Sequence, residues 1–514
     1  MIILLPVLIL LATSLTLVLI RIFHPGFRFN WLIGTSGALL SVISTIAWQL
    51  KMPMTFSLPA WRPVTIFLYS PSWLADGYSW PYALSLTTLG LAVIITAVIR
   101  KHSHPLNWAG VLFIISLGLL AVTSENPLTL VIAWIALDFA ELVILLNTVN
   151  AEKSEEIVVS FAVRLGGVFF LLWASIISIS LGSPMDFRAI PNRAGIFILL
   201  AVGLRLGILP LDLSIKEINI QRGVTTTLRL VSAASGLALL ARIPITSVPV
   251  NILPYLLLLT GILAIIGGWI WLISPDELSG RPFWILSIGS LALSATLFGN
   301  SIGSVAWGIS LILSGGLIFL YSNRHRSNYW LLFLGLWGLS SLPFSLTASV
   351  WLHQSNSNIL LIIPHIIAHS MILAGYTRHA FSRLGEVDIR SEPRWIQVIY
   401  PIGLSTLSIV IIIIGLWGWL GAHIVSKWWI SSATIVSSVI FYYFIKSTYT
   451  SIIGIQSKFY PRDLKLFFNT FWTIYRLLRQ LIKSLSSILE GDGGILWSIV
   501  LLVLFISLIS QVTH

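Results

Sequence analysis

Two carboxylates in the middle of an apolar run are the residues best suited to chemistry. Asp138 and Glu141 lie in the apolar run 127–147, and they are the acidic residues of the sequence that sit mid-run. At a spacing of three on a helix they share one face, and carboxylates that close tend to hold one proton between them. A carboxylate in a membrane is costly unless it is paired or faces water. The pattern therefore predicts either a proton-carrying site or carboxylates that only neutralise a buried arginine.

Three arginines also fall inside apolar runs, namely Arg164, Arg205 and Arg229. Arginine keeps its proton in a protein, so it can bind an anion or shift a neighbour's pKa but cannot relay protons. We expect Arg205, five residues before Pro210, to face one of the two mid-run carboxylates, because each charge is too costly alone. Arg164 and Arg229 lie near the ends of their runs, where they either extend toward the membrane surface or take part in transport.

Two histidines one helical turn apart, His365 and His369, occupy the apolar run 358–377. This spacing can hold a metal, but no strong third ligand is near in sequence and the helix lacks the glutamate of the HExxH pattern. Because histidine titrates near neutral pH, we expect a hydrogen-bonded or proton-conducting pair and no metal.

The sequence offers no place for a cofactor of its own. It has no cysteine, which excludes disulfides, thiolate metal sites and ligation of iron–sulfur clusters by this chain. It also has no phosphate-binding loop and no dinucleotide-binding fingerprint. The chain is therefore expected to carry no redox cofactor of its own.

The composition indicates whether the chain is a water-soluble or a membrane protein. The 514 residues are 57% hydrophobic and 9% charged, with a mean hydropathy of +0.94, whereas soluble domains are about 25% charged. This excludes a water-soluble enzyme and predicts an integral, multi-pass membrane protein. The net charge of +12 is expected to mark cytoplasmic loops and contact with anionic lipid, and no nucleic acid.

Sixteen apolar runs are long enough to cross about 30 Å of hydrocarbon as helices. The runs are 2–22, 31–49, 79–99, 106–123, 127–147, 160–181, 193–211, 225–244, 251–273, 283–299, 302–321, 328–351, 358–377, 396–420, 426–445 and 495–512. No basic segment precedes the first run, and Arg21 follows its core, so we expect a retained span and not a cleaved signal peptide.

The basic residues of the loops predict the orientation. An even number of spans places both termini on one side, which carries 6 Lys and Arg residues, whereas the other side carries 21, Arg222 and Arg281 among them. Basic loops are retained in the cytoplasm. We therefore expect both termini on the non-cytoplasmic side of a bacterial plasma membrane or an equivalent energy-transducing membrane.

The segment 460–490 has a different pattern from the runs. Its apolar residues recur at helical spacing, and Lys465, Arg476, Arg479 and Lys483 line the opposite stripe. The pattern predicts a lateral amphipathic helix on the cytoplasmic side, roughly 40 Å long. It either floats on anionic lipid or braces neighbouring membrane subunits.

Four stretches of the sequence match a known pattern. Asp76-Gly77-Tyr78-Ser79, the stretch 126–134 (NPLTLVIAW), the stretch 161–166 (FAVRLG) and the stretch 205–210 (RLGILP) with Glu217 beyond it carry the likeness. They resemble the antiporter-like, proton-conducting membrane subunits of respiratory complex I, membrane-bound hydrogenases and multisubunit sodium/proton antiporters. The resemblance is strongest to the largest, L-type subunit of complex I.

The sequence departs from this family at several charged positions. Ile135 stands where the family has a glutamate after the tryptophan, and Arg205 stands where it has the lysine of the seventh helix. The lysine of the eighth helix falls near Ala234. The later half-channel, where the family places another buried lysine or glutamate, offers only Gly315-Gly316 and the stretch 342–350, which carry no charge. The fold and the partners of the family are therefore expected to transfer better than its proton path.

The resemblance implies an all-α polytopic membrane protein of about sixteen spans with two inverted five-helix repeats. The implied segments are 1–104 with N-terminal helices, 105–244 and 245–395 with the two repeats, 396–459 with additional spans, 460–490 with the lateral helix and 491–514 with a final anchor. The candidates for proton translocation are then Asp138, Glu141, Arg164, Arg205, Glu217, Arg229, His365 and His369.

The activity implied is proton translocation coupled to redox chemistry in other membrane-associated subunits, which would carry flavin, iron–sulfur clusters and quinone. The chain would thus be one subunit of a proton-translocating oxidoreductase without a redox site of its own. The alternatives are a structural scaffold that has lost conduction, or a subunit of a cation antiporter, a membrane-bound hydrogenase or an inorganic carbon transporter.

Overall fold

The computed structural model describes residues 2–59, 69–99, 105–148, 154–184, 186–206, 222–322, 328–352, 359–381, 392–423 and 428–459. The chain divides into two compact units. The first comprises Met1–Pro59 and Tyr69–Tyr442, and the second comprises Ala60–Leu68 and Tyr443–His514. The predicted lateral helix 460–490 and the final anchor 491–514 lie outside the described residues, as does Glu217.

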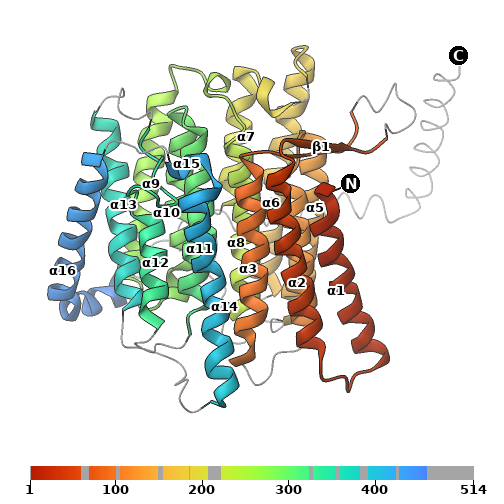
Figure 1. Cartoon of the computed structure of the whole chain (residues 1–514). Helices are drawn as coiled ribbons and strands as arrows, with labels where there is room; N and C mark the ends of the chain where they lie inside the picture. Colours follow the sequence, from red (N-terminus) through yellow and green to blue (C-terminus); the bar gives the residue numbers. More distant parts are fainter. Residues whose placement is uncertain are drawn as a thin grey trace, which may run out of the picture. The chain divides into compact units, whose positions relative to one another are not determined.

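Helices make up nearly all of the described chain (Figure 1). The α-helices are α1 (Leu5–Phe23), α2 (Asn30–Ala47), α3 (Ser79–Thr96), α4 (Pro105–Val122), α5 (Pro127–Thr148), α6 (Ser154–Ser180), α7 (Asn192–Arg205), α8 (Arg222–Leu240), α9 (Leu253–Ile273), α10 (Glu277–Leu297), α11 (Ser301–Leu320), α12 (Tyr329–Leu339), α13 (Ile359–Ala380), α14 (Arg394–Ile413), α15 (Leu420–His423) and α16 (Trp428–Phe459). Short helical turns are η1 (Ile2–Leu4), η2 (Trp48–Leu50), η3 (Ala97–Ile99), η5 (Phe187–Ala189), η6 (Ile245–Ser247) and the π-helical η10 (Ile414–Gly418). The predicted all-α polytopic fold is confirmed.

A small hairpin is the exception to the expected helical chain. Strand β1 (Met54–Ser57) pairs antiparallel with β2 (Ser72–Ala75), so that Met54 lies opposite Ala75. Thr55, Phe56 and Trp73 are residue types that favour strands. The segment is too short and too polar to cross a membrane, and pairing satisfies its backbone hydrogen bonds instead.

Twelve helices of the described chain are long and apolar enough to cross a membrane, so the expected count of sixteen is not confirmed. The run 193–211 yields α7, which is described only as far as Arg205 and Leu206, and the run 495–512 lies outside the described residues. The run 283–299 falls in α10, which has 21 residues but is not among these twelve helices. Its first five residues include the charged Glu277 and Arg281.

The run 328–351 does not form one continuous helix. α12 ends at Leu339 after 11 residues, and the following residues to 352 form turns. Ser341 and Phe344 adopt positive φ angles of 53° and 63°, which are uncommon for residues other than glycine. Thr347 secures the break, because its hydroxyl accepts the backbone N–H of Ser341 at 2.9 Å and donates to the Gly338 carbonyl at 3.0 Å. Irregular backbone at this depth is tolerated where protein covers it.

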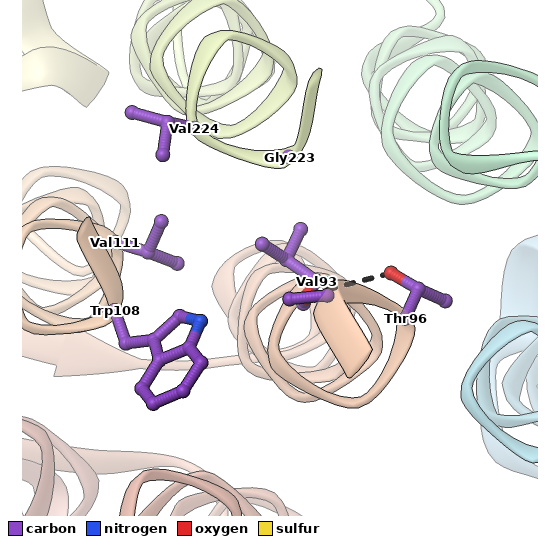
Figure 2. Close-up of a pocket in the computed structure, with 7 residues that line it drawn as sticks. Val93, Thr96, Trp108, Val111, Gly223 and Val224 are labelled. Atoms are coloured by element: carbon purple, nitrogen blue, oxygen red, sulfur yellow. Dashed lines mark hydrogen bonds between the residues drawn. The ribbon is translucent and has the colours of Figure 1, made fainter. Parts of the chain in front are cut away.

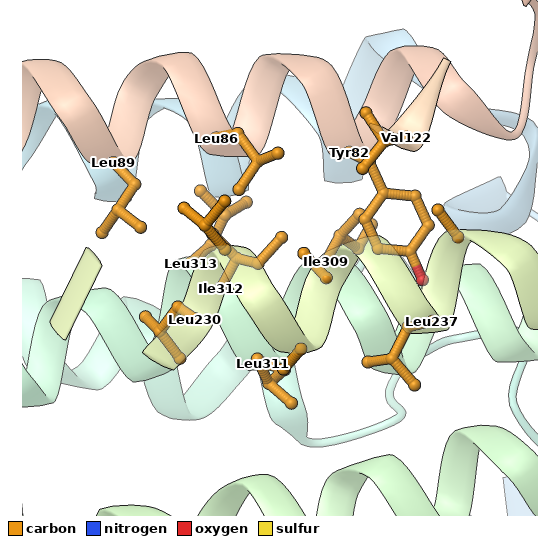
Figure 3. Packing of buried hydrophobic residues seen from close by; sticks show 14 of the residues in the cluster. Tyr82, Leu86, Leu89, Val122, Leu230, Leu237, Ile309, Leu311, Ile312 and Leu313 are labelled. Carbon is orange, nitrogen blue, oxygen red and sulfur yellow. The ribbon is translucent and has the colours of Figure 1, made fainter. Parts of the chain in front are cut away.

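The core of the first unit lies between α3, α8 and α11, each of which has 94% of its span buried. These three helices pack against one another, and Figure 3 shows their leucine and isoleucine side chains interleaved, Leu86, Leu230 and Ile312 among them. α3 and α11 have apolar residues on all their faces, as is expected at such a central place, whereas α8 also carries Arg222 and Arg229. Peripheral helices instead expose large apolar side chains such as Phe169, which is 70% exposed, as lipid contact requires.

Gly308 of α11 allows a close approach of α3, because a Cβ added there would overlap the Tyr82 hydroxyl. We expect Gly308→Ala to destabilise the subunit by about 1–3 kcal/mol through overpacking. Gly203→Ala on α7 is the matched control, since nothing lies within 4 Å of its added Cβ. Thermal unfolding of the two variants in detergent measures the difference. Equal unfolding temperatures would contradict the packing.

Candidate functional site

The start of α5 fixes the register of the two carboxylates. Asn126 precedes Pro127, and its side-chain oxygen accepts the backbone N–H of Thr129 at 2.9 Å, which is the bond of an N-cap. From this start the helix places Asp138 and Glu141 on one face, where they are 1% and 2% exposed. α5 packs against α4, α6 and α8, so both carboxylates lie within protein.

Asp138 forms an ion pair with Arg205, the penultimate described residue of this segment. The distance from Arg205 Nη1 to Asp138 Oδ2 is 3.0 Å, and the two side chains are 1% and 0% exposed. The predicted pairing of Arg205 with a mid-span carboxylate is thereby confirmed, with Asp138 as the partner. A pair this deeply buried interacts strongly but leaves a costly charge behind when either member is removed.

Two further contacts hold the guanidinium of Arg205. Its Nε donates to Ser235 Oγ of α8 at 2.7 Å, and its Cζ lies 4.5 Å from the centre of the Trp134 ring. Trp134 stands one helical turn before Asp138 on α5. A planar group with donors on several nitrogens fits these contacts, whereas the single ammonium of a lysine does not. The site is therefore shaped for arginine.

Glu141 forms a second ion pair, with Arg164 of α6. The Arg164 side chain is 9% exposed, so it does not extend to the membrane surface. Arg205 experiences the charges of both Glu141 and Arg164. Asp138, Glu141, Arg164 and Arg205 thus form one group of two positive and two negative charges, which we call the charge cluster.

The other arginine inside an apolar run, Arg229, is half-buried on α8. Glu217 lies outside the described residues. The position of Glu217 relative to the charge cluster therefore stays a prediction.

His365 and His369 of α13 are fully buried, and each is bonded to a backbone carbonyl. His365 Nδ1 lies 2.8 Å from the Leu361 oxygen, and His369 Nε2 lies 2.7 Å from the oxygen of Leu339, the last residue of α12. A ring nitrogen bonded to a carbonyl must carry the proton. In the described part of the chain the histidines bond to carbonyls and not to each other, and no group of three His, Asp or Glu residues could hold a metal there.

A second buried charged group was missed by the sequence analysis, which counted Arg222 and Arg281 among the loop residues. Arg222 begins α8 and pairs with Glu277 of α10. Arg281 is 1% exposed, donates to the Thr226 hydroxyl at 3.0 Å and lies 5.8 Å from the Phe319 ring centre. The four-residue spacing of Glu277 and Arg281, which places them on one helix face, was the sequence pattern that could have predicted this group.

Asp76 forms ion pairs with arginines from two loops. This group lies at the C-terminal end of α8, whereas Arg222 lies at its start. Arg242 lies 3.3 Å and Arg188 3.9 Å from its carboxylate, and the Ser79 backbone N–H donates to it at 2.9 Å. The Asp76 carboxylate therefore accepts a backbone N–H at the start of α3 as well as binding arginines. Burial lowers the pKa of Arg242, and the nearby Asp76 carboxylate opposes this shift. Arg188 and Arg242 thus approach the same carboxylate, and the side of the membrane on which they lie stays a prediction.

A small cavity between α3, α4 and α8 leaves about 10 Å³ for the centre of a water molecule (Figure 2). Its lining is mostly apolar, with Val93, Val111 and Val224 beside Trp108 and Thr96. Such a volume holds about one water molecule. No member of the charge cluster lines it, and its residues offer no acid or base.

No protein-family model matches the sequence. No curated protein matches it either.

Solved structures do match the fold. A chain of the Mrp complex from Dietzia sp. DQ12-45-1b has a TM-score of 0.73 and 13% identity, with 100% of this chain and 63% of that chain covered. A chain of the membrane-bound sulfane sulfur reductase, an archaeal respiratory membrane complex, has a TM-score of 0.63 and 14% identity, with 97% and 99% covered. A chain of respiratory complex I from Thermus thermophilus has a TM-score of 0.59 and 16% identity, with 80% and 98% covered.

The present chain thus spans less than two thirds of the Mrp chain that it matches, and nearly the full length of the other two. At these identities the likeness establishes the fold. The predicted resemblance to the antiporter-like membrane subunits of such complexes is confirmed at that level.

Proposed function

We propose that the chain is an L-type, antiporter-like membrane subunit of a complex I-like assembly, and that it takes part in proton translocation coupled to redox chemistry in partner subunits. The charge cluster is the observation that carries this proposal. Four ionisable side chains within the membrane are expensive, and such groups mark ion pathways by default. The fold shared with chains of three membrane complexes supports the choice of assembly.

The chemistry of the cluster assigns the proton-carrying role to its carboxylates. Arg164 and Arg205 stay protonated, so Asp138 and Glu141 are the members that gain or lose a proton. When a carboxylate is drawn away from its arginine, it loses its countercharge and binds a proton more readily. A movement of α6 or α7 relative to α5, driven from partner subunits, would then load and unload the site.

Beyond the buried Glu277 and Arg281 at the start of α10, the second half would conduct through uncharged groups. The described residues of α11 and α12 carry no acid and no lysine. Ser341, Ser345 and Ser349 have buried hydroxyls that find no hydrogen-bond partner within the described structure, and His369 bonds the end of the same broken helix. These hydroxyls, ordered water and the two histidines would form the path.

The partners would supply what this chain lacks. Flavin, iron–sulfur clusters and quinone would belong to other subunits, and the segment 460–490 would lie along them or on anionic lipid. One observation favours the scaffold alternative, in which conduction is lost. Both carboxylates have an arginine as a permanent countercharge.

Inverted membrane vesicles test the proposal. NADH should acidify vesicles that contain the assembly, and deletion of this chain should abolish most of that acidification while NADH oxidation by the remaining subunits is measured in parallel. Extraction in mild detergent, followed by mass spectrometry, should recover other membrane subunits with this chain. A stable monomer would contradict the assignment to an assembly.

The proposed orientation has its own test, because a chain without cysteine allows labelling at single introduced sites. We expect an impermeant maleimide added outside intact cells to label Ser183→Cys, and to leave Ser391→Cys unlabelled until the cells are opened. The reason is the excess of Lys and Arg in the loops of the second side, 21 against 6. The reverse labelling would overturn the orientation.

A further inference from the structure

The geometry points to a binding site for a single water molecule inside the charge cluster. We propose that this water is held by Asp138 Oδ1, Glu141 Oε1 and Arg205 Nη2, and that it joins the two ion pairs into one hydrogen-bonded unit. The proton-relay role of this water rests on the proposed function, whereas its presence does not.

Each of the three atoms is a buried polar atom without a hydrogen-bond partner among the described residues. Asp138, Glu141 and Arg205 are 1%, 2% and 4% exposed. Their remaining polar atoms are used, since Oδ2, Oε2, Nη1 and Nε all form the bonds of the two ion pairs and the serine contact. A buried charged group that leaves a donor or acceptor unpaired loses stability, so native proteins usually satisfy it with protein or water.

The three atoms belong to one small region. Asp138 and Glu141 share a helix face, and Nη2 is bonded to the same carbon as Nη1, which already contacts Asp138. The N–H bonds of a guanidinium lie in its plane. The Trp134 ring lies 4.5 Å from Cζ of this guanidinium and supplies no oxygen or nitrogen acceptor for it. Nη2 keeps its donors without a partner among the described residues, next to the Nη1 that contacts Asp138.

The chemistry of the three atoms matches water and disfavours other occupants. Two carboxylate oxygens accept and one guanidinium nitrogen donates, while a water molecule has two O–H donors and accepts in return. Three hydrogen bonds is also the typical number for a buried water. A sodium ion would be repelled by Nη2, and an anion would be repelled by both carboxylates.

This water would let a proton pass between the carboxylates. A protonated Glu141 gives its proton to the water oxygen, while the water gives one of its own protons to Asp138. One O–H bond breaks and one forms at each step, so Glu141 ends ionised, Asp138 ends protonated and the water is unchanged. The two arginines keep their charge throughout.

Cryo-electron microscopy of the intact assembly, at a resolution that shows ordered water, tests the site. We expect one density peak at about 2.7–3.2 Å from all three atoms. Absence of a peak, direct contact between the two carboxylates, or a peak enclosed by five or six oxygens at about 2.4 Å, as for a metal cation, would each overturn the proposal.

Two variants sharpen the result. Ser235→Ala removes the partner of Arg205 Nε but none of the three atoms, so the peak should remain. Glu141→Asp withdraws one acceptor by a methylene group, so the peak should weaken or move toward Asp138. An unchanged peak in Glu141→Asp would contradict the assignment. A peak in a complex that moves no protons would refute the proposed function and leave the water site standing.

Discussion

Arg205→Gln is expected to lower the stability of the subunit by about 3–5 kcal/mol, because it leaves Asp138 buried without its countercharge. The distance from Arg205 Nη1 to Asp138 Oδ2 is 3.0 Å, and both side chains are buried. The double variant Asp138→Asn with Arg205→Gln should be milder, since it removes both charges and keeps two amides that can hydrogen-bond. Thermal unfolding and the abundance of the assembled complex measure both effects.

Arg205→Lys separates charge from shape in this site. It keeps the positive charge opposite Asp138 but loses the Nε contact with Ser235 and the flat face that stacks on Trp134. Its effect should therefore lie between those of the wild type and Arg205→Gln. The control is Arg28→Gln, whose side chain is exposed and whose loss should stay within about 0.5 kcal/mol. If Arg205→Gln behaved like Arg28→Gln, the buried pair would not be a stabilising element.

The sequence was sufficient to predict that buried charges pair, because the energetic argument needs only their depth in an apolar run. It was not sufficient to say which acid Arg205 takes. Asp138 and Glu141 share a face, and the choice depends on how α6 and α7 are rotated against α5, which places Arg164 beside Glu141. Those rotations come from contacts between helices that no single run contains.

Hydropathy also predicted the place of most helices but not the break after Leu339. The residues that follow are apolar enough on average to extend the run, and the hydroxyls of Ser340 and Thr347 satisfy part of the broken backbone. The buried pair of Arg222 and Glu277 was missed for a related reason. From the sequence alone, charged residues at the end of an apolar run cannot be told from loop residues, because it is a neighbouring helix that buries them.

The double variant Asp138→Asn with Glu141→Gln is expected to reduce proton translocation by the assembly at least about tenfold, because proton transfer by a positioned acid or base contributes about 10²–10⁴-fold to rate. In the proposed function no other group of the charge cluster exchanges a proton. The amide oxygens still accept from Arg205 and Arg164, so the contacts are altered less than by truncation. Dye quenching in inverted vesicles reports translocation, and NADH oxidation is followed in the same sample.

Asp276→Asn is the matched control for this double variant. Asp276 is an exposed cap of α10, and asparagine caps helices equally well, so neither assembly nor translocation should change. Native gels must show that the double variant still assembles, because two uncompensated arginines stay buried in it. Loss of translocation in an assembled complex supports conduction through Asp138 and Glu141. Full translocation in an assembled complex would show that the cluster serves only to hold α5, α6 and α7 together, and the scaffold alternative would replace the pump.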